Sequence, residues 1–501
     1  MELRKLKYIS TRNTNPKNAD CKSSAEVIIK GIADDGGLFV PTEIPKIDND
    51  FITSLCKMDY PHRAAEILKL YLTDFSYDEL LKACTESYAS EKFGTEPASV
   101  KKVGDNNILE LWHGPTKAFK DMALQLLPRL LSLSLGKTGI KEDALILVAT
   151  SGDTGKAALE GYADIDRVKI IVFYPNDGVS NMQKRQMVTQ KGNNICVVAI
   201  NGNFDDAQSG VKKIFSDRAI SDELLNKGIF LSSANSINWG RLAPQIVYYF
   251  SAYCDLVNNK TIKMGDVIDV TVPTGNFGNI LAAYIAGQMG LPTGTLVCAT
   301  NNNKILADYF SNGSYDKRRN FYTTVSPSMD ILISSNLERL LCLTYGTEFC
   351  KNNMSFFCEN SYFETDKNKN PLIFEKFAGI SCNEDQTKET IAKYFSDYSY
   401  LLDPHTAVAI YCADLYKKEN KSTNKMLVVS TASPYKFPYA VAESLGVENC
   451  KDEFECLEML EKKSGIKIPE AISGLKTENI RFRETISSND MAKRVLEFSF
   501  K

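Results

Sequence analysis

The chain has 501 residues, of which 44% are hydrophobic and 24% are charged, and this is enough for about two to four domains with large buried cores. Its net charge of −3 argues against the broad basic surface by which proteins bind nucleic acid or anionic membranes. No run of about 18 apolar residues occurs, which argues against a transmembrane helix.

The cysteines and histidines argue against a metal site. The 13 cysteines include no Cys-x-x-C pair, and they do not cluster with histidine at zinc-ligand spacing. A histidine-based site would need nearly all of His62, His113 and His405. No Gly-x-Ser-x-Gly sequence indicates a serine hydrolase. Scattered, unpaired cysteines are typical of a reducing compartment, so we expect a cytoplasmic protein without a metal.

Residues 1–95 are predicted to form a separate N-terminal region of mixed structure. The patterns predict, in chain order, a strand at 8–12, a helix at 24–32, a short strand at 38–41 and two helices between 59 and 89. An acidic, glycine-containing run ends the first helix, and we interpret its Gly36-Gly37 pair as a plain hairpin turn.

Beyond Gly104, apolar strands alternate with helices, which predicts an α/β fold with parallel sheets. Strands are predicted at 108–112, 144–149, 168–173, 194–200, 267–272, 295–299 and 426–430. Helices are predicted at 117–135 with a kink at Pro128, and at 156–162, 204–216, 242–250 and 280–289. We therefore expect a central region at 96–450, in which a smaller α/β subdomain at about 125–225 accompanies a larger one.

Residues 451–501 are predicted to be a helical C-terminal extension. A charged amphipathic helix at 451–465 has Phe454, Leu457 and Leu460 on its apolar side. The segment after Gly474 is polar, and we expect it to be a loosely packed tail. The stretch at 351–370, which is rich in asparagine and aromatic residues, is expected to be an exposed insertion.

The segment 111–123 carries the candidate catalytic lysine. Its Gly-Pro pair breaks the backbone, Thr116 is placed to cap the next helix, and a helix from Lys117 puts Lys120 in its first turn. The positive end of a helix dipole lowers the pKa of a lysine amine, and a neutral lysine is a nucleophile suited to forming a Schiff base. The alternative is a solvated lysine at the start of an amphipathic helix.

Two glycine-rich turns follow predicted strands, at the strand ends where ligands collect in α/β sheets. Residues 150–156 and 273–279 each lead into a helix and can present backbone N–H groups to an anion. The first turn lacks two required residues of a nucleotide P-loop and suits a carboxylate, with a structural cap as the alternative. The second turn leads into a long apolar helix and is the better candidate for a phosphate cradle.

Two further segments supply a hydroxyl group and a cation. Residues 431–437 follow the last predicted strand, and their hydroxyls are placed to meet a heteroaromatic nitrogen, with a plain turn as the alternative. Residues 232–241 run into a helix and end with Arg241. This arginine is suited either to bind a phosphate through two N–H groups or to form a structural ion pair.

A neutral lysine, a phosphate cradle and a hydroxyl for a ring nitrogen match the binding requirements of pyridoxal 5′-phosphate (PLP). The run His113-Gly-Pro-Thr-x-Ala-Phe-Lys-Asp resembles the cofactor-lysine motif of the threonine synthase family. Four other segments resemble the same family, in the same order along the chain: 35–41, 150–155, 235–238 and 274–278. The resemblance extends over residues 5–440.

The resemblance implies a PLP enzyme of fold type II, in which two α/β domains with parallel or mixed sheets hold PLP between them. It implies conversion of O-phospho-L-homoserine and water to L-threonine and phosphate by γ-elimination and β-addition, the last step of threonine biosynthesis. Lys120 would form the Schiff base with PLP and shuttle protons, and Asp153 would act near the ring. Thr116 would assist at the leaving phosphate.

The other roles are expected from the resemblance or from charge and position. The further cofactor-binding residues are expected to be Gly275, Asn276, Phe277, Asn279 and Thr431. The substrate-binding residues are expected to be Ser151, Gly152, Thr154, Arg241, Asn235 and Lys117. His113 and Asp121 are expected to hold the loop and its lysine in place rather than to take part in the chemistry.

Two other functions fit the same residues. One is another PLP lyase of this fold, such as a dehydratase acting on serine, threonine or a phosphorylated analogue. The other is a binding or regulatory relative that has lost catalysis, against which the intact Lys120 and both glycine turns argue. We expect a monomer or homodimer that acts on a small molecule, with neither nucleic acid nor membrane as a partner.

Overall fold

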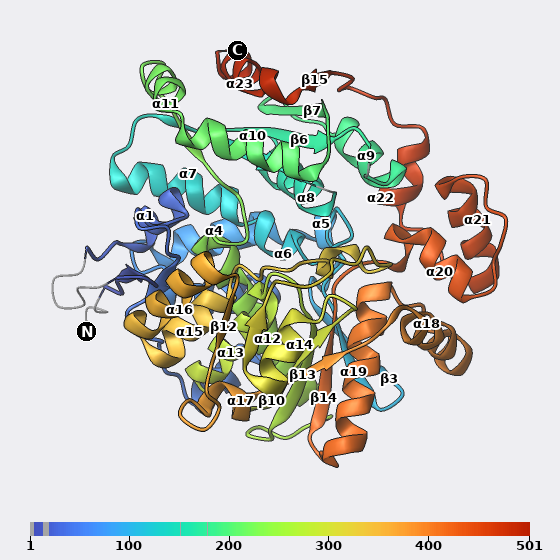
Figure 1. Ribbon diagram of the computed structural model, residues 1–501. Helices are drawn as coiled ribbons and strands as arrows, with labels where there is room; N and C mark the ends of the chain where they lie inside the picture. The colour runs from blue at the N-terminus through green and yellow to red at the C-terminus, as the bar shows by residue number, and fades with distance from the viewer. Residues whose placement is uncertain (1–4, 14–19, 151, 178, 501) are drawn as a thin grey trace.

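Two β-sheets, each with helices on both faces, occupy the upper and lower halves of the view in Figure 1. The computed structural model describes residues 5–13, 20–150, 152–177 and 179–500. Five strands form the upper sheet and six form the lower one. The alternation of strands and helices therefore builds the α/β fold that the sequence predicts, with one parallel and one mixed sheet.

The five-stranded sheet is entirely parallel, in the order β15-β7-β6-β5-β8. Its strands are β5 (Asp143–Ala149), β6 (Val168–Pro175), β7 (Ile195–Asn201), β8 (Ile229–Ser232) and β15 (Thr485–Ser487). Side chains alternate between the faces of a strand, so Leu145 and Leu147 pack on one side of β5 and Ile146 and Val148 on the other. Burial on both faces is the reason that β5 is a continuous apolar run.

Helices cover both faces of this sheet. Its outer face packs against α10 (Phe204–Ser216), α11 (Arg218–Leu225) and α23 (Met491–Ser499) (Figure 1). Its inner face packs against α7 (Leu127–Thr138) and α8 (Asp153–Tyr162), and α9 (Asn181–Val188) lies beside α8. The inner helices therefore lie between the two sheets.

The six-stranded sheet is mixed, in the order β13-β10-β9-β14-β4-β3, because β3 runs antiparallel to β4. Its strands are β3 (Ser99–Val103), β4 (Asn106–Glu110), β9 (Ile268–Pro273), β10 (Thr293–Thr300), β13 (Phe377–Ser381) and β14 (Lys425–Ser430). One face packs on α12 (Trp239–Asn258) and α13 (Gly278–Met289). The other face packs on α18 (Glu384–Tyr398) and α19 (Pro404–Asn420).

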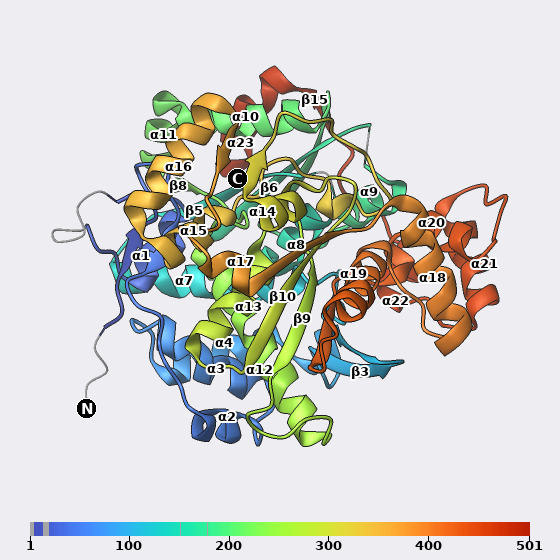
Figure 2. The same ribbon diagram turned by 60° about the horizontal axis from the view of Figure 1, so that its bottom comes forward.

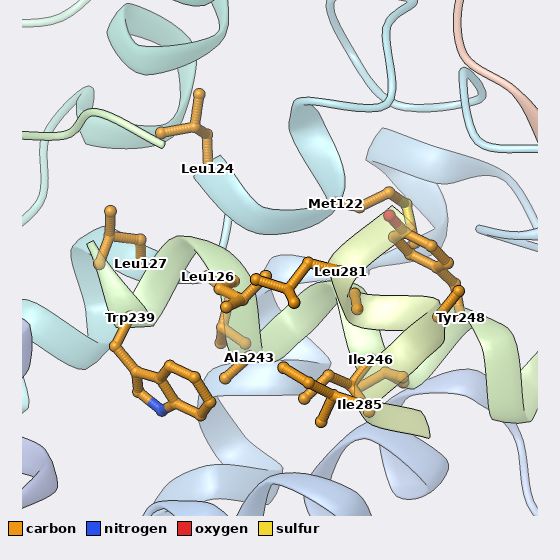
Figure 3. Packing of buried hydrophobic residues seen from close by; sticks show 14 of the residues in the cluster. Met122, Leu124, Leu126, Leu127, Trp239, Ala243, Ile246, Tyr248, Leu281 and Ile285 are labelled. Carbon is orange, nitrogen blue, oxygen red and sulfur yellow. The ribbon is translucent and has the colours of Figure 1, made fainter. Parts of the chain in front are cut away.

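One buried core, centred on α12, joins the two sheets. Figure 3 shows Met122 and Leu126 packed against Ala243 and Tyr248 of α12. The same cluster includes apolar residues of both sheets, so the segment that follows Lys120 is anchored where the two halves meet. In the described ranges, no helix is both long and apolar enough to cross a bilayer.

The N-terminal region packs onto this core, and its buried residues belong to the same cluster. A separate N-terminal region at 1–95 stays a prediction. Its elements are β1 (Tyr8–Ser10), α1 (Ser24–Lys30), β2 (Phe39–Pro41), α2 (Asn49–Leu55), α3 (Tyr60–Tyr71), α4 (Tyr77–Ser87) and α5 (Ser90–Phe93). The Gly36-Gly37 pair is not a hairpin turn. It joins α1 to β2, and β2 pairs with β1, which lies on the other side of α1 in the sequence.

Residues 351–370 form regular secondary structure, and many of them are exposed, as expected. They belong to α16 (Thr347–Asn360) and β12 (Tyr362–Glu364), and β12 pairs antiparallel with β11 (Ser314–Asp316). Met354, Phe357 and Phe363 are buried in the main core, which explains the aromatic content of the stretch. Neighbouring elements are α14 (Ile305–Asn312), α15 (Leu337–Tyr345), α17 (Leu372–Lys376) and the 3₁₀ helix η1 (Pro327–Met329).

The segment after Gly474 is not a loosely packed tail. It forms β15, which is the parallel edge strand beside β7, and α23, which buries Met491 and Val495 in the outer core of the five-stranded sheet (Figures 1 and 2). The helix predicted at 451–465 is α21 (Glu453–Ser464). The remaining elements are α20 (Pro438–Ser444), α22 (Glu470–Ser473), η2 (Pro434–Lys436), η3 (Gly474–Lys476) and η4 (Ser488–Asp490).

A close backbone contact fixes α8 against the segment that follows Lys120, and it leads to a stability prediction. A Cβ at Gly161 would lie 1.9 Å from the carbonyl oxygen of Leu124, whereas a Cβ at Gly136 would meet no atom within 4 Å. Gly161→Ala is expected to cost roughly 1–3 kcal/mol, because backbone atoms must move apart. We expect its thermal unfolding midpoint, measured by calorimetry, to fall by about 1–3 °C.

The control for this prediction is Gly136→Ala, also within a helix. Alanine favours a helix by about 1 kcal/mol relative to glycine, so this variant is expected to unfold at or above the wild-type temperature. If Gly161→Ala and the wild type unfolded at the same temperature, the close contact between Gly161 and the backbone of Leu124 would be contradicted.

Candidate active site

Three neighbouring strands of the six-stranded sheet, β4, β14 and β9, end at the same edge. The strand β4 leads to the Lys120 loop, β14 leads to Thr431, and β9 leads to the second glycine turn. Leu111 N donates to Ser430 O (3.0 Å), and Phe119 N donates to Thr431 O (2.8 Å). The sheet therefore brings the predicted lysine, hydroxyl and phosphate turn to one edge, where parallel strands place ligands.

The Lys120 loop does not contain the helix that the sequence predicts from Lys117. Lys117 has φ +59°, outside the right-handed helical region, and α6 spans only Asp121–Leu124. Pro128 lies in the first turn of α7, where its missing N–H is not required, so the chain forms two helices and not one kinked helix. Lys120 is the N-cap residue of the four-residue α6. The dipole of so short a helix is not the main influence on its amine.

Asp121 holds this loop from the inside. Its carboxylate accepts hydrogen bonds from Thr116 N (2.8 Å) and Thr116 Oγ1 (2.7 Å), and burial raises its pKa to about 6. Thr116 is 0% exposed. Thr116 does not cap a helix, because α6 begins at Asp121 with Lys120 as its N-cap residue. Its hydroxyl donates to Asp121 and shapes the loop, and its expected role at the leaving phosphate stays a prediction.

Lys120 is a largely buried amine, with 12% of its side chain exposed, and its pKa is lowered. Burial is the largest cause, the charge of Asp153 opposes it, and the charges of Lys436 and Arg241 add to it. Lys120 Nζ lies 3.7 Å from Asp153 Oδ2. The predicted direction of the pKa shift is found, but its cause is desolvation and not a helix dipole.

The first glycine turn places Asp153 at the start of α8, directed at the lysine. The hydroxyl oxygen of Thr150 accepts from Gly152 N (3.0 Å), and Gly152 has φ +152°, which favours glycine there. Thr154 is partly exposed in the first turn of α8. Ser151 lies outside the described residues, so its expected substrate contact stays a prediction.

Lys436 is a site residue that the sequence reasoning missed. It ends η2, is 3% exposed, and its Nζ lies 2.9 Å from Asp153 Oδ1. It also donates to the backbone oxygen of Thr116 (2.8 Å). The only signal in the sequence was a lysine five residues after Thr431, and that pattern does not distinguish a buried lysine from a solvated one.

The second glycine turn has the geometry of an anion cradle. A Cβ at Gly275 would lie 2.8 Å from the backbone oxygen of Ser328, so only glycine fits. Phe277 is buried with φ +64° and is the N-cap residue of α13. Asn279 Oδ1 accepts from the hydroxyls of Tyr248 and Tyr249, while its buried Nδ2 has no hydrogen-bond partner in the described structure.

The unpaired Nδ2 of Asn279 is a donor that a bound phosphate oxygen would satisfy, because a buried donor without a partner costs free energy. The side chain of Asn276 is exposed, and its backbone oxygen accepts from Asn336 N (3.1 Å). Thr431 is buried at the end of β14. Nearby, Ser433 Oγ is buried and also lacks a partner within the described ranges.

Arg241 is a buried guanidinium with few partners. It is 5% exposed, its Nη1 donates to Ala234 O (2.8 Å), and its Nε has no partner among the residues described. Burial lowers its pKa to about 10, against the opposing influence of Tyr162. The hydroxyl of Tyr162 is likewise buried without a partner in that part of the chain. A guanidinium with an unpaired Nε and an unpaired hydroxyl both suit an anionic ligand.

Two predicted substrate residues are turned to other partners or to solvent. Lys117 Nζ donates to the backbone oxygen of His113 (3.0 Å), and Asn235 is exposed in the turn before α12. The His113 ring bonds to Glu110 (2.9 Å), so this histidine supports the loop in the way expected of it. The substrate contacts of Lys117 and Asn235 stay predictions.

The fold and this site define a class of protein. PLP needs an amine, a phosphate cradle and a partner for its ring nitrogen, and the edge of the six-stranded sheet presents Lys120, the Gly275 turn and Thr431. The residues therefore fit PLP. The family model described as "Pyridoxal-phosphate dependent enzyme" matches residues 108–432.

The particular family follows from the flanking regions and the relatives. Models described as "Threonine synthase N terminus" and "Threonine synthase, C-terminal" match residues 7–88 and 406–490. The threonine synthase of Pseudomonas aeruginosa is 38% identical, over 88% of this chain and 90% of that protein. The chain belongs to the threonine synthase family of PLP-dependent enzymes.

Two further proteins are similar to this chain, and this chain covers a different share of each. The structure of PLP-bound threonine synthase from Brucella melitensis matches with a TM-score of 0.87 and 34% identity, over 99% of this chain and 100% of that one. "Threonine synthase-like 1" of Macaca fascicularis is 38% identical over 89% of this chain. The chain spans only 61% of the length of that relative.

Proposed function

We propose that this protein is a threonine synthase, which converts O-phospho-L-homoserine and water to L-threonine and phosphate in the last step of threonine biosynthesis. The observation that carries the proposal is the buried Arg241, whose charge acts on Lys120 and whose Nε is unpaired in the described structure. A phosphorylated substrate bound at Lys120 would supply the missing anion.

Lys120 is proposed to be the catalytic residue. When bound, PLP supplies an aldehyde that bonds to an amine and a ring that takes up electrons from the substrate Cα. Because its pKa is lowered, the Lys120 amine can be neutral, and it can remove a proton from Cα and then from Cβ once the substrate has displaced it. Loss of phosphate from Cγ and addition of water at Cβ, with protons returned to Cα and Cγ, give threonine.

The other residues are proposed to bind and to orient. Asn279, Gly275, Asn276 and Phe277 would hold the cofactor phosphate, and Thr431 would meet the ring nitrogen. Arg241, Lys117 and Thr116 would bind the substrate phosphate, and Asn235 would also contact the substrate. Ser151, Gly152 and Thr154 would receive the substrate carboxylate. Gly152 N donates to Thr150 within its own turn. The N-terminal end of α8 is therefore the main source of free backbone N–H groups for the carboxylate.

The compartment and the assembly state are also proposed. With Cys196 left aside, the cysteines of the described residues are free thiols, which supports the reducing cytoplasm as the location. A monomer or homodimer is proposed because Lys120, Asp153 and Lys436 of one chain already meet in the site. The proposed catalytic region remains 96–450, completed by β15 and α23 of the C-terminal residues.

The test of the proposed function is a product analysis. Purified protein with PLP is incubated with O-phospho-L-homoserine, and threonine, phosphate and 2-oxobutyrate are measured. Threonine and phosphate are expected in equal amounts. Formation of 2-oxobutyrate without threonine would indicate a dehydratase instead. The absence of both bound PLP absorbance and turnover would indicate a relative that has lost catalysis.

A further inference from the structure

Asp153 lies between two buried lysines that come from distant parts of the chain. Its Oδ1 is 2.9 Å from Lys436 Nζ, and its Oδ2 is 3.7 Å from Lys120 Nζ. Asp153 begins α8, beside the five-stranded sheet, whereas both lysines belong to loops at the edge of the six-stranded sheet. The three side chains therefore form an ionic contact across the junction of the two halves of the molecule.

The two lysines do not lie equally close to the Asp153 carboxylate. Lys436 Nζ bonds to Asp153, to the backbone oxygen of Thr116 (2.8 Å) and to the side-chain oxygen of Gln186 (3.4 Å). An ammonium group has three N–H donors, so each donor of Lys436 has an acceptor. Lys120 is beyond hydrogen-bond distance from the same carboxylate. Lys436 is thus held at hydrogen-bond distance from the Asp153 carboxylate, and Lys120 is not.

Four charged groups act on Lys120: Asp153, Lys436, Arg241 and Asp121. Asp153 and Asp121 favour the charged form of the amine, and Lys436 and Arg241 disfavour it. The pKa of Asp153 is held well below its usual range, and among the favourable charges Lys436 contributes most. Lys436 therefore affects the Lys120 amine in two ways. Its own charge disfavours the charged form of that amine, and its ion pair with Asp153 occupies the carboxylate that would favour the charged form.

We propose that Lys436 is a positioning residue for the reaction: by engaging Asp153 in an ion pair, it keeps that carboxylate from pairing closely with Lys120. The inference rests on the proposed role of Lys120. It assigns to Lys436 no contact with the substrate and no bond to PLP.

The opposing signs of the two charges allow a double-mutant test. Lys436→Met removes the cation and leaves Asp153 to pair with Lys120, which favours the charged amine. Asp153→Asn removes the anion and has the opposite effect. The double variant Asp153→Asn/Lys436→Met removes both, so the two effects should largely cancel. Lys436→Arg keeps the charge and serves as the conservative control.

The measurement is the rate at which PLP recombines with the protein after the cofactor has been removed, followed by absorbance between pH 6 and pH 10. Only the neutral amine reacts, so the pH midpoint of this rate reports the protonation of Lys120. We expect Lys436→Met to raise the midpoint by about one pH unit or more, the usual effect of a nearby charge. Asp153→Asn should lower it, and the double variant and Lys436→Arg should lie near the wild type.

The pH midpoint of the recombination rate does not depend on what fraction of a variant is folded. Partial misfolding therefore does not obscure the comparison between variants. A Lys436→Met midpoint equal to that of the wild type would overturn the proposal. Equal upward shifts for Lys436→Met and Lys436→Arg would also overturn it, because they would indicate a steric role. No phosphohomoserine is used, so failure here is distinguishable from failure of the proposed threonine synthase activity.

Discussion

Lys120→Ala is expected to abolish the covalent attachment of PLP and to lower turnover by about a thousandfold or more, because one residue serves as both nucleophile and proton carrier. The absorbance of lysine-bound PLP near the edge of the visible range should disappear. The fold should be retained, since Lys120 contributes no buried ion pair closer than the 3.7 Å contact with Asp153.

Three lysines lie in or against this loop, so the site of attachment can be tested directly. Borohydride reduction of the wild-type protein with PLP, followed by trypsin, should place the label on the peptide 118–129, because a modified Lys120 is not cleaved. A label on Lys117 or Lys436 would contradict the assignment. The reduced Lys120→Ala protein should carry no label, and it provides the background for the measurement.

Arg241→Met is expected to raise the KM for O-phospho-L-homoserine by roughly 10- to 100-fold, the loss expected for one or two hydrogen bonds to a charged group. The affinity for PLP should change little. The same variant should unfold at a higher temperature than the wild type without ligand, because it removes a buried cation with no carboxylate within salt-bridge distance in the described structure.

Arg339 offers a matched control for this prediction. It is also a buried arginine, but its guanidinium donates to the backbone oxygens of Phe39 and Ile237 and to Asn336. Arg339→Met should therefore lower the unfolding temperature. If Arg241→Met lost PLP while keeping its KM, Arg241 would belong to the cofactor site instead. Unfolding temperatures with and without PLP separate these outcomes, because a bound ligand stabilises the folded state and only a cofactor-site residue would change the effect of PLP.

Much of the fold could be predicted because its signals are local. A strand such as β5 is buried on both faces and is apolar throughout, whatever its neighbours are. The glycine turns could be placed for the same reason, since Gly152 has φ +152° and a Cβ at Gly275 would meet the backbone. Strand and turn chemistry are encoded in a few consecutive residues.

The errors arose where long-range contacts outweigh local pattern. The strand β15 has three residues and follows a polar segment, but it finds a parallel partner in β7, almost three hundred residues earlier. The helix expected from Lys117 is absent because Asp121 bonds to Thr116 and holds the loop in a conformation that includes φ +59°. Neither partner is visible in a window of neighbouring residues.

The amino-acid sequence alone was sufficient to predict the alternation of strands and helices, the two glycine turns and the candidate lysine. Five motifs in it were also sufficient to identify the resemblance to a family. The tertiary structure was needed to explain why Lys120 has a lowered pKa, since burial depends on the groups that pack around it. It was also needed to find that Lys436 and Asp153 meet, although they are far apart in the chain. Charges act through space, and their positions are known only once both sheets are assembled.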